Sequence, residues 1–284
     1  MITLKKWMDI IYTLVKAPIT KPTEMGADKK LLILANGPSA NEFWKNEKQA
    51  EKFSSYDLMC MNHAIYTNKE DIFRFKPSFF ILVDPVFWGK IPEGEGNRKE
   101  YYDRIKNNVN KVLEKIDWKA FIITNYHGNI TFKNKNLTVI RLNRNKILPE
   151  KERYYKLYKK NLANPGMDTV LESAIFWGIT FGYKEIALLG TEFSMFKDLI
   201  VDQNNIVYNC SKHFYEEKLE DLSVKAVTKG KFGFEGSAVA YYLHRISNCF
   251  SMFFELRKYA DFYRCKIYNY TPDSMIDVFE RRII

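Results

Sequence analysis

Residues 30–39 read KLLILANGPS, and this stretch decides the fold that the sequence predicts. The apolar run at 31–35 is too uniformly hydrophobic for a half-exposed sheet, so it predicts a buried parallel strand. In the turn that follows, Gly37 permits close backbone approach, Pro38 fixes φ, and Ser39 can cap the next helix. The N-terminus of that helix would offer N–H groups to an anion. No Walker lysine follows, which argues against a P-loop ATPase.

The same alternation of apolar runs and helical segments continues along the chain. Strands are expected at 31–35, 58–61, 79–83, 120–124, 137–142, 185–189 and 266–270, and helices at 41–53, 98–116, 169–181, 236–263 and 274–281. This order predicts an α/β, Rossmann-like doubly wound fold with a mostly parallel sheet. Residues 194–235 lack clear periodicity and are expected to form a lid subdomain. The predicted organisation is an N-terminal helix and linker at 1–29, a Rossmann-like domain at 30–193, the lid at 194–235, and a segment at 236–284 that completes the Rossmann-like domain.

The amino-acid composition limits the classes to which the protein can belong. The 284 residues are 46% hydrophobic, which supplies an ordinary core and excludes wholesale disorder. The formal net charge of +10 favours an anionic partner, either nucleotide phosphates or an acidic membrane surface. Nucleic acid is disfavoured because the lysines are dispersed and no recognition motif accompanies them. The four cysteines have no metal-ligand spacing, so we expect reduced thiols and no metal site.

The N-terminus carries a separate signal. Apolar residues recur there at helical spacing, with lysines off that face: Leu4, Trp7, Met8, Ile11, Leu14 and Val15 against Lys5, Lys6 and Lys16. Such a helix can lie in a membrane interface, where apolar burial and attraction to anionic lipid add together. The alternative is a helix that packs on its own domain or on a partner subunit. Proline and glycine then break the pattern, and residues 20–30 are expected to be a linker.

Polar turn residues follow several of the expected strands. Ligands of open α/β sheets bind outside the carboxyl ends of the strands, so these residues are the candidate ligand site. They are Asn36, Gly37 and Ser39 after the first strand, Asn62 after the second, Asp84 after the third, Gly190, Thr191 and Glu192 after the sixth, and Thr271 after the seventh. Glu192 ends a buried strand, where a carboxylate commonly accepts hydrogen bonds from ribose hydroxyls. A salt bridge to a lysine is the competing role.

A second helix start lies at Gly166-Met167-Asp168-Thr169. Thr169 and Glu172 have the spacing of a capping box, and Gly182 is placed to end this helix. Two helix N-termini at one edge of the sheet predict a phosphate site, and the alternative is a pair of well-capped structural helices. In the expected lid, His213 could remove a hydroxyl proton near neutral pH, although a surface role is the other interpretation.

These residues carry a resemblance to a known family. The turn at 36–39, Asn62, the block 174–192 and the segment 266–274 resemble the bacterial sialyltransferases of glycosyltransferase family 42, over most of residues 30–281. The resemblance implies a GT-A-like sialyltransferase variant of the Rossmann-like fold. It further implies an inverting enzyme that needs no metal or other cofactor. That enzyme would transfer a sialic acid or related nonulosonic acid from a CMP-sugar to a hydroxyl of a lipooligosaccharide or capsule glycan.

The resemblance also assigns roles at the donor. Asn36 and Asn62 would contact its phosphate and ribose, and residues 190–192 would hold the cytidine. Thr169 and its neighbours Gly166 and Asp168 would meet the donor through backbone N–H groups. Asp84 stands where the family has an amide ligand, which is a departure. The sequence also has Asn164-Pro165-Gly166 in place of a family arginine, so the donor sugar is left open.

For catalysis, the resemblance implies that His213 deprotonates the acceptor and that Tyr208 and Tyr215 hydrogen-bond the departing phosphate. A bacterial enzyme of this kind would be cytoplasmic and peripheral on the inner membrane through residues 1–18. Two other classes stay open: a pterin pyrophosphokinase-like diphosphokinase, with Mg²⁺ held by Asp84 and Glu192, and a non-enzymatic nucleotide-binding scaffold. The oligomeric state also stays open, a homo-oligomer included.

Overall fold

The computed structural model describes residues 8, 11, 25–91, 99–128, 130–209 and 236–283, and the backbone of 225–226. Met8 and Ile11 are helical and more than half exposed. The other residues of the predicted N-terminal helix lie outside the described residues, so its contact with a membrane stays a prediction. None of the helices in the described ranges combines the length and the apolar character that a membrane span requires.

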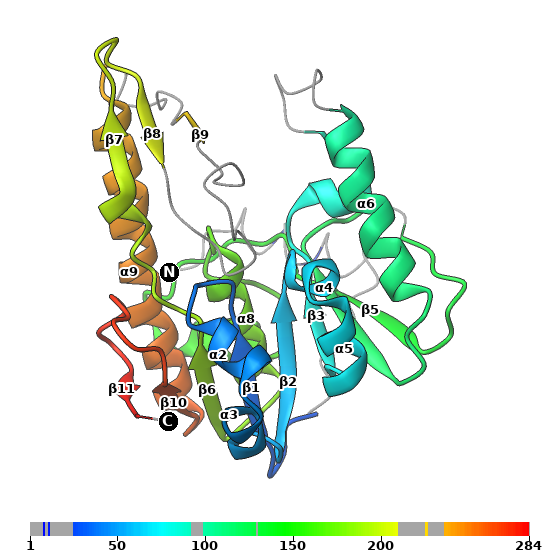
Figure 1. The fold of residues 1–284 in the computed structure, drawn as a ribbon. Coiled ribbons are helices and arrows are strands. Elements are labelled where there is room, and N and C mark those ends of the chain that lie inside the picture. Colours follow the sequence, from blue (N-terminus) through cyan, green and yellow to red (C-terminus); the bar gives the residue numbers. More distant parts are fainter. Residues whose placement is uncertain are drawn as a thin grey trace.

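An eight-stranded parallel sheet forms the centre of the molecule (Figure 1). Its strands are β1 (Lys30–Leu34), β2 (Tyr56–Met61), β3 (Phe79–Ile81), β4 (Ala120–Thr124), β5 (Leu137–Arg141), β6 (Glu185–Leu189), β10 (Lys266–Asn269) and β11 (Glu280–Arg281). They lie in the order β11-β10-β6-β1-β2-β3-β4-β5, and every neighbouring pair is parallel. All seven predicted strands are confirmed, and β11 is additional.

Helices cover both faces of this sheet. They are α2 (Ala40–Lys45), α3 (Glu47–Lys52), α4 (Ala64–Thr67), α5 (Lys69–Phe75), α6 (Lys99–Leu113), α7 (Tyr155–Lys159), α8 (Val170–Thr180) and α9 (Ala238–Phe262), with 3₁₀ turns η1 (Pro85–Trp88), η3 (Glu152–Tyr154) and η4 (Met195–Asp198). Side chains of β1 alternate between two cores. Leu31 and Ile33 pack towards α7, α8 and α9, whereas Leu32 and Leu34 pack towards α2 to α6. The fold is therefore α/β and Rossmann-like, as the sequence predicts.

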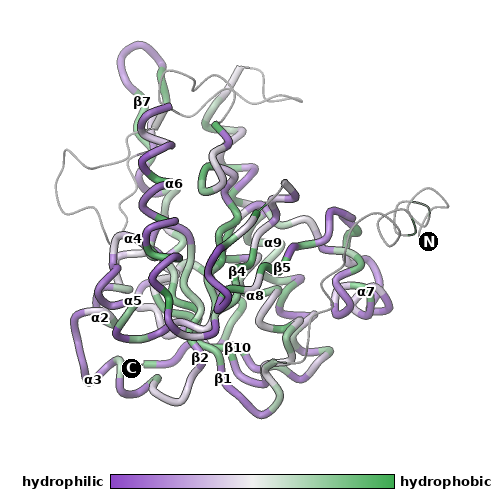
Figure 2. The backbone as a smooth tube through the Cα atoms, turned by 90° about the vertical axis from the view of Figure 1, so that its right-hand side faces the viewer, coloured by the Kyte–Doolittle hydropathy of each residue, from purple (hydrophilic) through white to green (hydrophobic). Residues whose placement is uncertain are grey.

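The distribution of hydropathy agrees with this layering. In Figure 2 hydrophobic residues gather on the strands in the interior, and α6 alternates between hydrophobic and hydrophilic positions. The buried residues of α6 recur at helical spacing, namely Tyr102, Ile105, Val109 and Val112. The α6 helix is thus amphipathic and covers the sheet with one face.

Two of the predicted helices differ from the structure. The helix expected at 41–53 is broken at Asn46, whose side chain accepts hydrogen bonds from the N–H groups of Lys48 and Gln49 and so starts α3. The prediction of a helix at 274–281 is wrong. Ser274 is buried and hydrogen-bonds Asn269 and the carbonyl of Thr191, and the chain then extends to pair β11 with β10. Tertiary hydrogen bonds outweigh local helix propensity here.

The expected lid contains a second, antiparallel sheet. It consists of β7 (Leu199–Val201), β8 (Val207–Asn209) and β9 (Lys225–Ala226), in that order. Asn209 of β8 donates a hydrogen bond of 2.7 Å to the hydroxyl of Tyr242 on α9. The small sheet therefore lies beside the first half of α9, above the carboxyl ends of the central strands (Figure 1).

The start of α8 is fixed by the capping box that the sequence predicts. Oε2 of Glu172 accepts hydrogen bonds from the N–H groups of Asp168 (2.6 Å) and Thr169 (2.8 Å), and Oγ1 of Thr169 accepts one from Glu172 (3.3 Å). Gly182, with φ of 89°, ends the helix. Glu172 is fully buried. Burial raises the pKa of its carboxyl to about 7, although the hydrogen bonds from Thr169 and Asp168 lower it.

We predict a pH dependence of stability from this group. Because the folded pKa of Glu172 lies above the unfolded one, the folded protein holds an extra proton, and stability falls as the pH rises from about 4.5 to about 7. Glu172→Gln keeps the capping geometry and removes the titration. Its free energy of unfolding should match wild type at pH 4 and exceed it at pH 8, by about 3 kcal/mol. Urea unfolding at both pH values measures this, with exposed Glu51→Gln as the control. Equal pH profiles for Glu172→Gln and wild type would contradict the role assigned to Glu172.

Candidate functional site

The strand order contains a topological switch point between β1 and β6. From β1 the chain proceeds through β2, β3, β4 and β5 in one direction, and then returns to place β6 and β10 on the other side of β1. Ligands of open α/β sheets bind at the carboxyl ends of the strands at such a point, because the connections diverge there. The two turns that meet at this place are the predicted site segments 36–39 and 190–192.

Direct contacts join these two turns. The N–H of Gly37 donates to the carbonyl of Gly190 (2.9 Å), and the N–H of Ser39 donates to Oε1 of Glu192 (2.6 Å). Glu192 thus caps the start of α2. Ser39 itself makes no side-chain cap, so that prediction is wrong. The next N–H groups, of residues 40–42, donate to carbonyls of residues 37–39, so the anion at this helix start is Glu192 itself.

Four buried oxygen atoms at these strand ends have no hydrogen-bond partner among the described residues. They are Oδ1 of Asn36, Oγ of Ser39, Oδ1 of Asn62 and Oε2 of Glu192. Buried polar atoms are nearly always hydrogen-bonded in native proteins, and each unpaired one costs about 1–3 kcal/mol. The four atoms follow three neighbouring strands, β2, β1 and β6. A ligand that brings hydroxyl or amino donors to this edge would satisfy them.

The backbone around these atoms is in unusual conformations. Asn62 has φ of 45°, and Phe193, directly after Glu192, has φ of 49°. A positive φ is unfavourable for a bulky residue such as Phe193, and such residues cluster at functional sites. Gly190 also has a positive φ, of 75°. The turn after β6 is therefore held, at Phe193, in a geometry that local preference does not favour.

Thr191 and Thr271 take part in a buried network that shapes the turn after β6. Oγ1 of Thr271 accepts a hydrogen bond from the N–H of Thr191 (2.9 Å), and the two hydroxyls lie 2.9 Å apart. Asn269 and Ser274 complete the network, with Ser274 donating to the carbonyl of Thr191 (2.6 Å). Both threonines are nearly inaccessible to solvent. These two predicted site residues hold Glu192 in place through the backbone.

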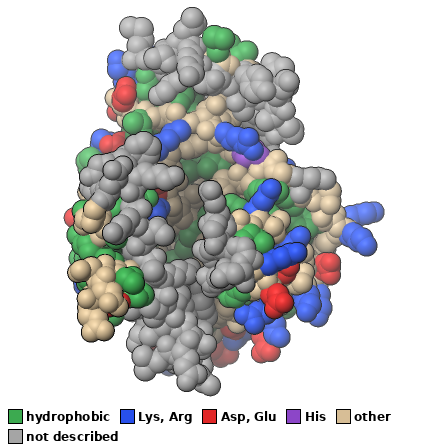
Figure 3. Space-filling model, turned by 90° about the horizontal axis from the view of Figure 1, so that it is seen from above, with side chains coloured by type: hydrophobic (Ala, Val, Ile, Leu, Met, Phe, Trp, Pro, Cys, Tyr) green, Lys and Arg blue, Asp and Glu red, His purple; other side chains and the backbone are tan. Residues whose placement is uncertain are grey.

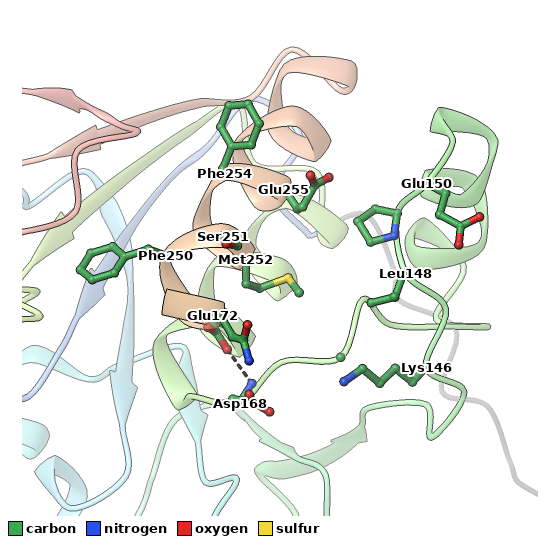
Figure 4. Close-up of a pocket in the computed structure, with 13 residues that line it drawn as sticks. Lys146, Leu148, Glu150, Asp168, Glu172, Phe250, Ser251, Met252, Phe254 and Glu255 are labelled. Atoms are coloured by element: carbon green, nitrogen blue, oxygen red, sulfur yellow. Dashed lines mark hydrogen bonds between the residues drawn. The ribbon is translucent and has the colours of Figure 1, made fainter. Parts of the chain in front are cut away.

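The other predicted donor residues lie at the same edge of the sheet. Asp84 follows β3, and its Oδ1 accepts a hydrogen bond from the N–H of Val86 at the start of η1 (3.1 Å). Thr169 lies at the start of α8, which runs antiparallel to the strands and so begins at their carboxyl ends. Gly166 and Asp168, just before it, line a cavity between α8 and α9 (Figure 4).

The backbone N–H groups expected to meet the donor are already paired: those of Asp168 and Thr169 donate to Glu172, and that of Gly166 donates to Oδ1 of Asn164 (2.8 Å). The predicted phosphate site at two helix N-termini is therefore wrong, because the protein's own carboxylates, Glu192 and Glu172, cap α2 and α8.

The predicted catalytic residues are only partly described. His213 and Tyr215 lie outside the described residues. Tyr208 is half-buried on β8, and its hydroxyl donates to Oδ2 of Asp202 (3.3 Å). Partial burial and the Asp202 carboxylate raise the pKa of Tyr208, so its hydroxyl stays protonated at neutral pH, with its proton directed at Asp202.

The described histidines have structural partners. Nδ1 of His63 pairs with the hydroxyl of Tyr66, Nε2 of His127 lies 2.8 Å from the carbonyl of Leu142, and Nε2 of His244 lies 3.2 Å from Nδ2 of Asn248. Burial and the nearby arginines 144 and 141 lower the pKa of His127.

Seen from above, the carboxyl edge of the sheet is hollowed. Figure 3 shows a depression with hydrophobic side chains on its floor and several Lys, Arg and one His side chain beside it. Lys and Arg side chains on this face of the molecule favour an anionic ligand over a cationic one.

Fold and site together define a class: a Rossmann-like α/β protein with a candidate ligand site at its switch point. No family model matches the chain. No curated protein sequence is significantly similar to it either.

The close approach of the two turns predicts the effect of a side chain at position 37. A Cβ atom there would lie 1.6 Å from Oε2 of Glu192 and 2.6 Å from the carbonyl oxygen of Gly190. Gly37→Ala must therefore displace Glu192, and we expect it to lower the free energy of unfolding by about 1–3 kcal/mol. Urea denaturation measures the loss.

Gly236→Ala is the matched control, because a Cβ atom at position 236 has nothing within 4 Å. Its stability should stay within about 0.5 kcal/mol of wild type. If Gly37→Ala were as stable as Gly236→Ala, the turn would not be packed against Glu192 as described.

Proposed function

We propose that the protein is an inverting glycosyltransferase that moves a sialic acid or related nonulosonic acid from a CMP-sugar to a hydroxyl group of a cell-surface glycan. The observation that carries this proposal is the set of four unpartnered buried oxygens around the β1–β6 switch point. The resemblance of the same turns to the family 42 sialyltransferases supports the choice of donor.

The chemistry of cytidine monophosphate fits this set of atoms. Its ribose hydroxyls and cytosine amino group are hydrogen-bond donors, and the oxygens of Asn36, Asn62 and Glu192 are acceptors. Each asparagine amide also has an N–H₂ group, which can donate to the phosphate. A carboxylate at the end of a buried strand is the usual partner of ribose hydroxyls in dinucleotide folds. In our proposal, Glu192 therefore binds the nucleoside and the two asparagines bridge nucleoside and phosphate.

In the proposed reaction, the acceptor hydroxyl oxygen attacks the anomeric carbon of the donor sugar. The bond from that carbon to the phosphate oxygen breaks, and CMP leaves with the electron pair. The transition state resembles an oxocarbenium ion, so the protein must donate hydrogen bonds to the phosphate and supply a base on the opposite face of the sugar. We assign the base to His213, which takes the acceptor proton, and a phosphate contact to the protonated hydroxyls of Tyr208 and Tyr215.

Nucleotide titration by thermal shift tests the donor. We expect CMP to raise the melting temperature without Mg²⁺ and ATP with Mg²⁺ to leave it unchanged. Asn36→Ala should weaken CMP binding at least tenfold, yet leave the stability of the free protein unchanged or higher, because it removes an unpaired buried oxygen.

Asn134→Ala is the contrasting control. The Asn134 side chain donates to the carbonyls of Leu113 (2.9 Å) and Ile116 (2.8 Å), so its loss should destabilise the protein and spare CMP affinity. Stabilisation by ATP with Mg²⁺ would instead identify a diphosphokinase, and no response to any nucleotide would exclude a nucleotide site.

The assignment of the base predicts a second phenotype. His213→Ala should lower the rate of transfer at least 10²-fold and leave CMP affinity within a few-fold, because a base acts in the transition state. Transfer from a panel of CMP-sugars to a glycan acceptor measures the rate. His244→Ala on α9 should retain activity. Near wild-type turnover by His213→Ala would remove it as the base without affecting the nucleotide site.

A further inference from the structure

The positive charge of the chain is concentrated in one segment. Residues 141–160 read RLNRNKILPEKERYYKLYKK and contain eight Lys or Arg side chains against two Glu. Their formal charge of +6 is more than half of the +10 of the whole chain, although they are only 20 of its 284 residues. The segment begins at the end of β5 and continues through η3 and α7. The surface that it forms is therefore strongly basic.

η3 and α7 form a helical segment with a buried face and an exposed face. The buried face consists of three tyrosines that belong to the core on the α8 and α9 side of the sheet, Tyr154, Tyr155 and Tyr158. The exposed face carries three cations at positions i, i+3 and i+7, the spacing of one side of a helix, Arg153, Lys156 and Lys160. Figure 2 shows α7 on the side of the molecule away from α2 and α5. The three cations therefore lie together on an outer surface.

Packing of the tyrosines holds this helical segment in place. The ring centre of Tyr155 lies 5.3 Å from that of Tyr259 and 5.4 Å from that of Phe262, both on α9. The hydroxyl of Tyr158 donates to the carbonyl of Ile147, which joins α7 to the loop after β5. The cations are thus presented by an element that is packed on the core.

These cations lack ion-pair partners within the described part of the chain. Lys151 is exposed just before η3, and neither it nor any of the three cations of η3 and α7 forms an ion pair with a described residue. On the other face of the sheet, by contrast, Arg74 pairs with Glu47 (2.7 Å). Like charges that are held side by side repel one another, and a partner with a high density of negative charge relieves that repulsion.

Apolar side chains are exposed beside the cations. Leu148, on the loop before Lys151, is 50% exposed, and Phe262, which packs edge-on against Tyr155, is 38% exposed. Cations beside exposed apolar side chains are typical of surfaces that bind a membrane interface, because apolar burial and attraction to anionic headgroups add together. The phosphates of a nucleic acid would pair with the cations but would not cover Leu148. The composition of this surface therefore favours a lipid bilayer.

We propose that the α7 surface, defined as Leu148, Lys151, Arg153, Lys156 and Lys160, binds the anionic phospholipid headgroups of a bilayer. This is a membrane contact of the folded domain, separate from the predicted helix at residues 1–18. An apolar anchor together with a basic patch binds a membrane more stably than either does alone. The inference does not depend on which nucleotide occupies the switch point.

Co-sedimentation of the full chain with lipid vesicles tests the proposal. One set of vesicles is phosphatidylcholine alone, and the other is three parts phosphatidylcholine to one part phosphatidylglycerol. We expect binding to the anionic vesicles to be at least about tenfold tighter and to weaken as NaCl is raised. The variant Arg153→Glu/Lys156→Glu/Lys160→Glu should bind these vesicles at least about tenfold more weakly, because each cation near such a surface strengthens binding roughly fivefold.

Matched controls separate the α7 surface from net charge and from exposed apolar area. Lys48→Glu/Lys52→Glu/Lys111→Glu makes the same charge change at exposed positions of α3 and α6 and should stay within about threefold of wild type. Leu148→Ser should weaken binding to the anionic vesicles by about threefold or more. Ile200→Ser, at a position on β7 that is 55% exposed, should leave it unchanged.

The outcomes decide between lipid, nucleic acid and no partner. Unchanged vesicle binding in the α7 triple variant, or an equal loss in the α3 and α6 control, would overturn the α7 surface as a lipid contact. If the wild type bound a single-stranded RNA oligonucleotide and the triple variant lost only that binding, the surface would be assigned to nucleic acid instead. CMP should raise the melting temperature of the triple variant as it does that of wild type, so the lipid contact and the nucleotide site can fail independently.

Discussion

The rest of the site depends on one hydrogen bond, from the backbone N–H of Ser39 to the carboxylate of Glu192. It joins the turn after β1 to the turn after β6 across the switch point of the sheet. The bond is possible only because position 37 has no side chain, since any Cβ atom there would overlap Glu192. One oxygen of Glu192 accepts this bond, and the other is buried against Gly37 with no hydrogen-bond partner among the described residues.

Strand-end residues divide into two groups with different physical roles. Thr191, Thr271, Asn269 and Ser274 satisfy one another's hydrogen bonds in the interior and shape the turn. Asn36, Asn62 and Glu192 keep unpaired oxygens, which is costly for the free protein. In our account the first group holds the second in position, and hydrogen bonds from the bound donor offset the free-energy cost of the unpaired oxygens. Residues that stabilise the fold and residues that we expect to bind the ligand thus lie only a few positions apart in the sequence.

Much of the fold could be predicted because its signals are local. Buried parallel strands are continuous apolar runs, and the capping box of Thr169 and Glu172 depends on residues three apart. The break at Asn46 was not predicted, because the Asn46 cap competes with an apolar pattern that is helical on both sides of it. The absence of a helix at 274–281 could not be predicted, because it depends on contacts of Ser274 with the distant residues 191 and 269. In the candidate site, the sequence indicated which residues lie at the strand ends. It could not indicate that Glu192, rather than Ser39, caps α2, nor that Phe193 has a positive φ, since both follow from the approach of distant turns.

A crystal structure of the protein with CMP tests the central claim most directly. Our account predicts the nucleotide at the carboxyl ends of β1 and β6, with Oε2 of Glu192 and the amides of Asn36 and Asn62 within hydrogen-bond distance of it. A nucleotide at the opposite edge of the sheet, or those oxygens paired with other protein groups while CMP lies elsewhere, would contradict the account.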